Sequence, residues 1–534
     1  MKLSDLLREK NIYIPLPCGR AGVCGKCRVQ LANGETVLAC KYEVEEDFDV
    51  AGIKTMWNNR EISGISVEVN GGNSDIYQEM DGEVSAVALK KKGEDTGISL
   101  EKSGKKGNLT ERPTESDGIK SRVTETTVTK CAVTGESADV KSVGIAIDLG
   151  STTLAFALVD KDGKVIGTFT SENHQRSYGA DVISRIKASN EGELLKLKGI
   201  IANDLTAGIK RLLARNKTDI SEVELITIAG NTTMIHLAMG YSCESLGKYP
   251  FTPVTLEEVN TDVKSLLGTD EDIAVKILPG ISAFVGGDIV AGIYELEIYK
   301  EEKPALLIDL GTNGEMVLGG RDKLLVASTA AGPAFEGGKI SCGVPGISGA
   351  IYDVEIGLNG RRVKYSTIDG KMPVGICGTG IIALIYELKK NNIIDENGIL
   401  GDDYFENGYT IANGIKITWQ DIREFQMAKA AIRGGIEMLL KEYGITVAEL
   451  GKLYLAGGFG QFLNVEKAMG VGLLPEDLNC EVISVGNTSL KGAIKYLSEK
   501  LTGVITRILN ENVREVVLGG NEEFNDIYIK YLGV

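Results

Sequence analysis

The sequence predicts an α/β protein in which a small N-terminal domain is joined by a flexible linker to a large body of two similar lobes. Four of the nine cysteines in the 534-residue chain lie within residues 18–40. Residues 78–155 contain no aromatic side chain, and the rest of the chain carries an internal repeat. These three observations divide the chain into residues 1–71, a linker over 72–142, and lobes over 143–303 and 304–534.

The composition limits the classes of function. The 58 basic residues are outnumbered by 74 acidic residues, which gives a formal charge of −16. This charge argues against general binding to nucleic acids or anionic membranes. The first residues lack a secretory-signal pattern, and no run of about 18 apolar residues indicates a membrane span. We therefore expect a cytoplasmic protein with reduced thiols, in which clustered cysteines indicate metal or redox chemistry.

The N-terminal cysteines have an unequal spacing that separates kinds of metal site. Cys18, Cys24, Cys27 and Cys40 are separated by five, two and twelve residues. Structural zinc usually takes two close pairs of ligands, whereas only Cys24 and Cys27 form such a pair here. Plant-type 2Fe–2S ferredoxins use intervals of four and two residues and then a distant fourth cysteine. The spacing favours a 2Fe–2S cluster over zinc and over unmetallated thiols.

The residues around these cysteines predict a glycine-rich loop followed by a β-hairpin. Glycines let the backbone approach closely and turn its N–H groups toward the sulfur atoms. Asn33-Gly34 is a typical hairpin turn, and it would return Cys40 to the other three cysteines. Only 17 residues precede Cys18, so the first hairpin of a ferredoxin-like β-grasp domain is missing. We therefore expect a truncated β-grasp domain.

The next segment has too few apolar residues to form a core. Between residues 90 and 122 the only such residues are Ile98, Leu100, Leu109 and Ile119. A segment of this kind cannot bury enough surface to offset the entropy of the chain. We expect the region from 72 to 142 to be a flexible linker.

The large body repeats two kinds of segment. VGIAIDLGSTTLAFALVD (143–160) and ALLIDLGTNGEMVLGG (305–320) each combine an apolar strand, an Asp-Leu-Gly turn and a second strand. ELITIAGNTTMIHLAMG (224–240) and KLYLAGGFG (452–460) are strands that end in Ala-Gly and a tight turn. A helix of 3.6 periodicity is expected over 425–444. Because the order is the same twice, we expect two similar lobes that face each other across a cleft.

The repeated turns have the chemistry of phosphate cradles. A turn that follows an aspartate offers backbone N–H groups and hydroxyls to phosphate, and the aspartate can hold a hydrated Mg²⁺ ion. Adenosine could lie against the bare backbone of the last Ala-Gly-Gly turn. The candidates are Asp148, Gly150, Ser151, Thr152 and Thr153 on one side, Asp309, Gly311, Thr312 and Asn313 on the other, and Gly457 and Gly458 for adenosine.

The repeated motifs resemble those of the actin, sugar-kinase and heat-shock-chaperone ATPases, which have a duplicated ribonuclease-H-like fold. With the N-terminal cysteine module, the chain resembles the reductive activators of corrinoid-dependent enzymes. The resemblance covers most of the chain outside the linker. It rests on the four cysteines and on SYGADVISRI (177–186), IAGNTTMIHL (228–237), FVGGDI (284–289), IDLGTNGE (308–315), GPAFEGG (332–338), PVGICGTGII (373–382) and LAGGFG (455–460).

The resemblance implies an ATP-dependent, one-electron reduction of cobalt(II) to cobalt(I) in a corrinoid protein of a methyltransferase system. Cys18, Cys24, Cys27 and Cys40 would hold the 2Fe–2S cluster, and an upstream donor would supply its electrons. Asp148 and Asp309 would manage Mg²⁺ and phosphate. Asp288 and Glu336 lie among glycines and could orient water for ATP hydrolysis, although turn or capping roles are equally compatible with their positions. The oligomeric state is open, with a homodimer among the possibilities.

Other functions are compatible with parts of the sequence. An activator of a radical dehydratase would use a related ATPase fold, but such activators usually bridge a 4Fe–4S cluster between subunits and lack an N-terminal ferredoxin unit. A third hypothesis is a nucleotide-responsive binding protein in which the cluster is only structural. The chain has two histidines, so a histidine-based site is not expected. We interpret His236 as a satisfied core residue and His174 as solvent-exposed.

Overall fold

The computed structural model describes most of the body and part of the N-terminal domain. Cys18, Cys24, Thr312, Gly458 and the expected linker over 72–142 lie outside the described residues. The described residues are 1–10, 14, 27–45, 48–50, 53–55, 60–62, 143–311, 313–357, 362–457, 462–499, 505, 508–509 and 513–534.

The described residues of the N-terminal domain form one helix and a four-stranded antiparallel sheet in the order β2-β1-β3-β4. The expected hairpin is confirmed, because β1 and β2 pair across a turn in which Gly34 has a φ of 85°. This left-handed conformation favours glycine. The other edge of β1 pairs with β3. The elements are α1 (Leu3–Glu9), β1 (Arg28–Gln30), β2 (Thr36–Leu38), β3 (Ile53–Thr55) and β4 (Arg60–Ile62).

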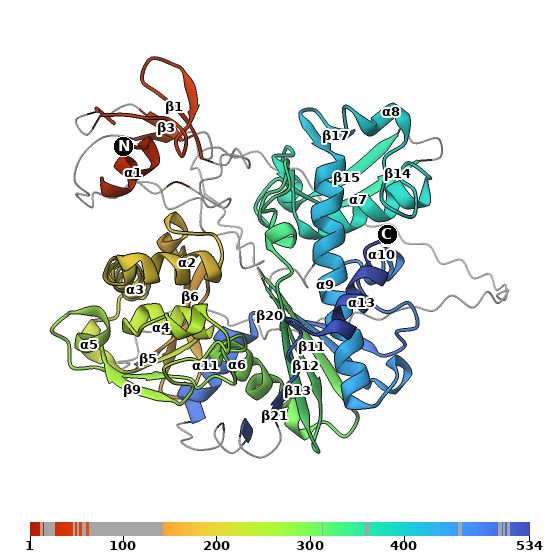
Figure 1. The fold of residues 1–534 in the computed structure, drawn as a ribbon. Helices are drawn as coiled ribbons and strands as arrows, with labels where there is room; N and C mark the ends of the chain where they lie inside the picture. Colours follow the sequence, from red (N-terminus) through yellow and green to blue (C-terminus); the bar gives the residue numbers. More distant parts are fainter. Residues whose placement is uncertain are drawn as a thin grey trace, which may run out of the picture.

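The first lobe is a six-stranded sheet with helices packed against it (Figure 1). Its strands are β5 (Val143–Leu149), β6 (Thr153–Asp160), β7 (Val165–Glu172), β8 (Val223–Gly230), β9 (Val259–Asp262) and β10 (Ala274–Ile277). Its helices are α2 (Val182–Ala188), α3 (Leu194–Asn216), α4 (Thr232–Met239), α5 (Val263–Leu267) and α6 (Gly287–Leu296). The strand order is β7-β6-β5-β8-β10-β9. Apolar side chains of α3, α4 and the strands form one core.

The second lobe repeats this plan with a sheet in the order β20-β19-β11-β12-β13-β21. Its strands are β11 (Ala305–Leu310), β12 (Gly314–Gly319), β13 (Leu324–Thr329), β19 (Lys452–Ala456), β20 (Glu481–Gly486) and β21 (Val513–Glu515). The long helix α9 (Trp419–Tyr443) contains the expected helix and packs against this sheet. Thr418 and Asp421 form a capping box at its N-terminus, and Gly444 ends it in the left-handed conformation.

The second lobe also carries a smaller outer part. Its strands are β14 (Ala350–Ile356), β15 (Val363–Thr367), β16 (Gly375–Ile376), β17 (Tyr409–Ala412) and β18 (Ile415–Ile417).

The other described α-helices of residues 304–534 are α7 (Gly378–Lys390), α8 (Asp402–Phe405), α10 (Val465–Gly470), α11 (Thr488–Glu499) and α13 (Glu522–Lys530). In the described part of the chain, no helix combines the length and apolar character required to cross a membrane.

The two lobes place their repeated motifs in identical register. In the first lobe, β5 is parallel to β8, and Asp148 lies opposite Ala229. In the second lobe, β11 is parallel to β19, and Asp309 lies opposite Ala456. Parallel neighbouring strands end at the same edge of a sheet. Each lobe therefore brings its aspartate turn and its Ala-Gly turn together at one edge, as the internal repeat predicts.

Helix α11 follows a strand of the second lobe but packs on the sheet of the first. In Figure 1 its blue ribbon lies beside α6, among the elements of the first lobe. Ala493, Tyr496 and Leu497 form a core with Ala146 of β5 and Tyr294 of α6. Gly492 approaches α6 so closely that a Cβ atom would lie 2.2 Å from the carbonyl oxygen of Ala291. Helix α11 therefore connects the lobes in two ways: the chain joins it to β20 of the second lobe, and its side chains pack on the first lobe.

Candidate nucleotide and cluster sites

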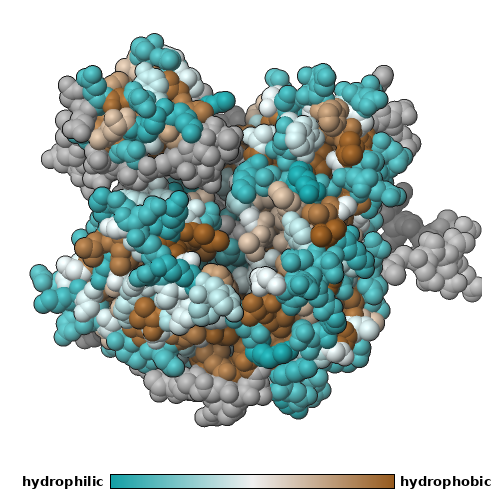
Figure 2. Space-filling model, viewed as in Figure 1, coloured by the Kyte–Doolittle hydropathy of each residue, from teal (hydrophilic) through white to brown (hydrophobic). Residues whose placement is uncertain are grey.

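Acidic side chains from both lobes gather where the aspartate turns end. We call Asp148, Asp288, Asp309, Glu315 and Glu336 the acidic cluster; all five are half-buried. Asp148 comes from β5 and Asp288 from the first turn of α6, whereas the other three come from the second lobe. Figure 2 shows that the molecular surface is hollowed between the lobes.

The acidic cluster holds its protons more tightly than isolated carboxyl groups do. Burial, together with repulsion from Asp288 and Asp148, raises the pKa of Asp309 to about 7. Burial, with repulsion from Asp148, also raises the pKa of Asp288 to about 7. Burial and the charges of Asp288 and Asp309 raise the pKa of Glu315 well above its usual range. A cation would relieve this repulsion, so the arrangement fits a bound divalent ion.

The acidic cluster does not form a compact cage for a bare ion. Among the described residues, no three histidine, cysteine or acidic side chains are close enough together to ligate one metal directly. Mg²⁺ commonly keeps several water ligands and takes only one or two carboxylates in nucleotide sites. The residues therefore fit the hydrated Mg²⁺ that the sequence predicts, held mainly through water.

Two residues at the start of α11 hold the side chain of Asp148, although they come from outside the sheet that contains Asp148. Asn487 donates a side-chain hydrogen bond of 2.8 Å to Oδ2 of Asp148. Ser489 donates one of 2.7 Å to Oδ1. These bonds favour the ionised carboxylate, but burial dominates and raises the pKa of Asp148. Both partners lie at the start of α11, so the position of Asp148 depends on the docking of this helix.

The turns beside the aspartates are tightly packed. At Gly150 a Cβ atom would lie 2.5 Å from the carbonyl oxygen of Thr153, so only glycine fits there. Gly311 donates a backbone hydrogen bond of 3.0 Å to Asn313, and its Cα faces Glu336. Gly457 has a φ of 79°, and a Cβ atom there would lie 3.2 Å from Oδ1 of Asp309. The predicted adenosine turn and the predicted Mg²⁺ aspartate are thus immediate neighbours in the second lobe.

In the N-terminal domain, the hairpin brings two of the four predicted ligands together. The Sγ atoms of Cys27 and Cys40 lie 3.2 Å apart, and both residues are buried. This separation is too long for a disulfide bond. Cys27 precedes β1 and Cys40 follows β2, so the β1–β2 turn determines their approach. Two convergent buried thiols fit the thiolate coordination of an iron–sulfur cluster.

The comparisons with known proteins agree with this geometry. Residues 1–52 match the 2Fe-2S iron-sulfur cluster binding domain, residues 143–301 match the RACo middle region, and residues 303–534 match the C-terminal domain of RACo, the ASKHA domain. A solved structure described as a reductive activator for a corrinoid, iron-sulfur protein is 35% identical. That match covers 74% of this chain and 67% of the other, with a TM-score of 0.68.

The chain belongs to the family of reductive activators of corrinoid proteins.

Two curated relatives extend the comparison. The corrinoid activation enzyme RamQ of Eubacterium limosum is 29% identical over 581 aligned positions, gaps included, and the match covers 99% of this chain and 95% of the relative. A reductase of the cobalt(II) methylated-amine-specific corrinoid protein of Methanosarcina barkeri is 28% identical over 423 aligned positions, gaps included, and the match covers 72% of this chain and 76% of the relative. The resemblance found in the motifs is confirmed, as is the combination of a ferredoxin-like domain with an actin-like ATPase fold.

Sequence reasoning missed three residues of this activator's candidate site. Glu315 lies directly opposite Asp309 in the β11–β12 pair, and residues so paired point to the same face of a sheet. Asn487 and Ser489 hold Asp148. A signal for them was present, because Gly-Asn-Thr-Ser at 486–489 repeats Gly-Asn-Thr-Thr at 230–233, and both segments link a strand to a helix.

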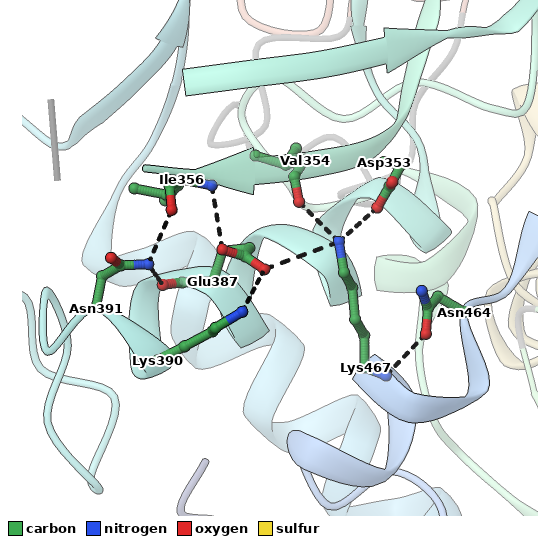
Figure 3. Close-up of polar contacts among 8 residues, drawn as sticks. All are labelled: Asp353, Val354, Ile356, Glu387, Lys390, Asn391, Asn464 and Lys467. Carbon is green, nitrogen blue, oxygen red and sulfur yellow. Dashed lines mark hydrogen bonds and ion pairs between the residues drawn. The ribbon is translucent and has the colours of Figure 1, made fainter. Parts of the chain in front are cut away.

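A buried ionic network anchors the helix after the Gly457 turn (Figure 3). Lys467 of α10 donates hydrogen bonds of 2.7 Å to Asp353 and 2.8 Å to the carbonyl of Val354. Its ammonium also lies 4.0 Å from Glu387 of α7. Glu387 accepts a hydrogen bond of 3.1 Å from the backbone N–H of Ile356. The network connects α10 to α7 and β14 beside a pocket of about 320 Å³.

The two histidines have different environments. His236 is buried in α4, where Nδ1 donates to the carbonyl of Thr232 at 2.8 Å and Nε2 accepts from the N–H of Val254 at 2.9 Å. The interpretation of His236 as a satisfied core residue is confirmed. His174 is partly exposed, but its ring pairs with Asp204 at 2.7 Å. The expectation of a simple solvated histidine is therefore incomplete.

Proposed function

We propose that this chain uses ATP to drive the one-electron reduction of cobalt(II) to cobalt(I) in a corrinoid protein. The single observation that carries the proposal is the joining of two features in one chain. One is the pair of buried cysteines in a 2Fe–2S domain. The other is a nucleotide-type site in which the segment that crosses from β20 of the second lobe to α11 holds a carboxylate of the first lobe. An enzyme with only one of these features would have either no electron source or no coupling to ATP.

The N-terminal domain provides the electron-transfer function. A 2Fe–2S cluster held by Cys18, Cys24, Cys27 and Cys40 supplies a single electron at a low potential when bound. The residues of the hairpin keep Cys27 and Cys40 together and shield their sulfur atoms from water, which the buried positions of both residues support. Cys18 and Cys24 are proposed ligands from the sequence and lie outside the described residues.

The body provides the ATP-dependent function. Asp148 and Asp309 would orient the water shell of a Mg²⁺ ion that carries the nucleotide phosphates. Gly150, Ser151, Thr152 and Thr153 would receive phosphate on one side, and Gly311, Thr312 and Asn313 on the other. Gly457 and Gly458 would seat adenosine. Glu336 and Asp288 are the proposed groups that orient the attacking water, and the raised pKa of Asp288 suits a group that can accept a proton near neutral pH.

ATP is needed because the electron transfer is energetically uphill. A plant-type 2Fe–2S centre has a potential near −400 mV, and each ~59 mV deficit for one electron costs a factor of ten in the equilibrium constant. Reduction becomes feasible if the ATP-bound body binds the cobalt(II) protein in a state that is easier to reduce. A ligand can shift such an equilibrium only through its different affinities for the two states. Hydrolysis would then release the reduced partner.

The partner and the donor follow from the same proposal. The relative from Methanosarcina barkeri is named for a corrinoid protein specific for methylated amines, which supports a corrinoid protein of a methyltransferase system as the partner. Because each turnover removes one electron from the cluster, an upstream electron donor is required. A homodimer stays a prediction that light scattering of the purified protein can test.

The proposal is tested by ATP turnover under anaerobic conditions. We expect the reconstituted protein to hydrolyse ATP slowly alone and several-fold faster when a cobalt(II) corrinoid protein is added. The same corrinoid protein in its methylcobalt(III) form serves as the control and should not stimulate hydrolysis. Equal stimulation by both forms, or by neither, would contradict the proposed coupling between the cobalt state and the nucleotide.

A further inference from the structure

Three buried side chains lie together beneath the turn after β5. Asn173 follows β7, Arg185 lies in α2 and Met234 lies in α4. All three are fully buried. The Sδ atom of Met234 contacts Nη1 of Arg185 at 3.1 Å and Nδ2 of Asn173 at 3.6 Å. We call these three residues the buried platform.

The buried platform binds two successive carbonyl groups of the turn. Nδ2 of Asn173 donates to the carbonyl oxygen of Gly150 at 2.9 Å. Nη2 of Arg185 donates to the carbonyl oxygen of Ser151 at 2.5 Å. In a trans peptide unit, the C=O of one residue and the N–H of the next point in opposite directions. The N–H groups of Ser151 and Thr152 are therefore directed away from the platform.

Two successive N–H groups turned the same way form an anion-binding concavity. Arg185 adds a positive charge directly behind it. The hydrogen-bond partners that the described residues offer its guanidinium are neutral: the carbonyls of Ser151 and Gly179 and the sulfur of Met234. Burial lowers the pKa of Arg185 to about 9, so the group stays protonated at neutral pH. The carboxylates of Asp181 and Glu336 act on this charge only through space. A buried charge whose hydrogen-bond partners are neutral is costly, and a bound anion would offset the cost that remains.

We propose that Asn173 and Arg185 are positioning residues that hold the Ser151–Thr152 turn in a phosphate-binding conformation before nucleotide arrives. The inference rests on the proposed function in that it takes the phosphates of ATP as the anion. It assigns a role to SYGADVISRI and IAGNTTMIHL, the motifs that contain Arg185 and Met234. In this proposal Asn173 and Arg185 do not touch the nucleotide; each acts through the backbone of the turn.

The structure also gives both residues local tasks, so the test must separate them. Asn173 accepts a hydrogen bond of 3.0 Å from Gln175 N–H, and Arg185 binds Gly179 at 3.0 Å. Asn173→Ser keeps a side-chain oxygen that can cap Gln175 N–H and removes the amide donor to Gly150 without adding a charge. Arg185→Met removes the guanidinium hydrogen-bond donors and the positive charge but keeps a side chain of similar length. Arg185→Lys keeps the positive charge and a single ammonium group as donor. Lys429→Met is the matched control, because Lys429 is also buried and donates to the carbonyl of Tyr531 at 2.6 Å.

The experiment compares ATP with adenosine, which lacks phosphates. Affinities of the full-length variants are measured with Mg²⁺ present, by calorimetry for ATP and by ligand-observed NMR for adenosine. We expect Asn173→Ser and Arg185→Met to weaken ATP binding about tenfold or more, as loss of a buried or charge-assisted hydrogen bond would. Adenosine binding should change less than about twofold. Arg185→Lys should recover part of the ATP affinity, and Lys429→Met should leave the ratio of the two affinities unchanged.

The measured affinities distinguish a positioning role of the buried platform from a purely structural one. Equal weakening of ATP and adenosine would mean that the platform is only structural, and unchanged ATP binding in both variants would overturn the inference outright. If Arg185→Met does not fold, Asn173→Ser carries the test by itself, because it keeps a side-chain cap and leaves the charge of the site unchanged. Failure of the unaltered protein to bind ATP would instead overturn the proposed function.

Discussion

Asn487 and Asp148 are joined by a hydrogen bond of 2.8 Å although they are 339 residues apart in sequence. Asp148 belongs to the central strand pair of the first lobe, and Asn487 lies between β20 of the second lobe and α11. The same asparagine accepts a hydrogen bond of 2.8 Å from the N–H of Leu490 and so caps α11. A movement of the second lobe would therefore be transmitted to the carboxylate that we assign to Mg²⁺.

Loss of this contact should impair ATP turnover without unfolding the protein. We expect Asn487→Ala to reduce ATP hydrolysis about tenfold, because Asp148 loses one of its two orienting donors and the loss of a charge-assisted hydrogen bond costs about 1.5–3 kcal/mol. Asn487→Asp should be worse, since it places a second carboxylate beside Asp148 while still capping the helix. Steady-state hydrolysis at saturating Mg²⁺ measures both. If the aspartate variant were as active as the unaltered protein, Asn487 would have no electrostatic role.

Asp309 should be essential for hydrolysis and irrelevant to the cluster. Asp309→Asn keeps the shape of the side chain but removes its charge, so we expect ATP hydrolysis to fall by about two orders of magnitude or more. The visible spectrum of the iron–sulfur protein should be unchanged, because the cysteines lie in a separate domain. Asp403→Asn changes an exposed aspartate of α8 and is the control. Loss of the cluster spectrum in Asp309→Asn would refute the independence of the two domains.

The acidic cluster should make stability depend on pH in an unusual direction. The pKa values of Asp288 and Asp309 are about 7 in the folded protein, against about 3.9 in an unfolded chain. Between these values the folded state binds more protons, so the free energy of unfolding decreases as the pH rises from about 4 to 7 and then levels off. Urea denaturation from pH 5 to pH 8 measures this. Asp309→Asn should flatten the dependence, and MgATP should reduce the loss; an increase in stability over this range in the absence of nucleotide would contradict the account.

Much of this arrangement could be predicted from the sequence, for identifiable reasons. The Ile-Asp-Leu-Gly repeat specified both the strands and their polar ends, and Asp148 and Asp309 indeed lie opposite the alanines of Ala229-Gly230 and Ala456-Gly457. Asn33-Gly34 predicted the hairpin that brings Cys27 and Cys40 together, because Gly34 readily adopts the left-handed conformation that the turn requires.

Other features depend on contacts that local patterns do not encode. The packing of α11 on the first lobe could not be predicted, because its apolar face fits either sheet equally well by periodicity. The platform of Asn173, Arg185 and Met234 joins three elements, and only the folded chain shows that their polar atoms converge. Glu315 was visible in the motif, but its alignment with Asp309 required the register of β11 and β12.

The network around Lys467 should contribute strongly to the stability of the second lobe. Lys467→Met leaves the carboxylates of Asp353 and Glu387 without their shared ammonium. Removing one partner of a fully buried ion pair costs about 3–5 kcal/mol, and the loss here should be smaller because the Asp353 side chain is 34% exposed. We expect a clear decrease in the urea midpoint of the body. Lys390→Met, which removes an exposed lysine 3.8 Å from the same Glu387, should change stability by less than about 1 kcal/mol. Similar effects of the two variants would show that the Lys467 network is not a stabilising element.

Cys40 should be required for the cluster but not for ATP handling. Cys40→Ser should abolish stoichiometric iron and sulfide binding, because a hydroxyl replaces one of the four proposed thiolate ligands. ATP hydrolysis stimulated by the corrinoid protein should be retained. Cys480→Ser, which changes an isolated cysteine of the second lobe, should keep a full cluster. Normal iron and sulfide contents in Cys40→Ser would remove this residue from the ligand set.

The most direct test of ATP-driven reduction is a single turnover in the absence of any other reductant. The protein is reduced at its cluster, separated from excess reductant, and mixed anaerobically with an excess of its cobalt(II) corrinoid partner while the absorbance of cobalt(I) is followed. With MgATP, we predict that cobalt(I) forms in an amount approaching one equivalent per reduced chain, while the cluster is oxidised at the same rate. Without nucleotide, only a small fraction should form. Equal yields of cobalt(I) with and without MgATP would contradict the account.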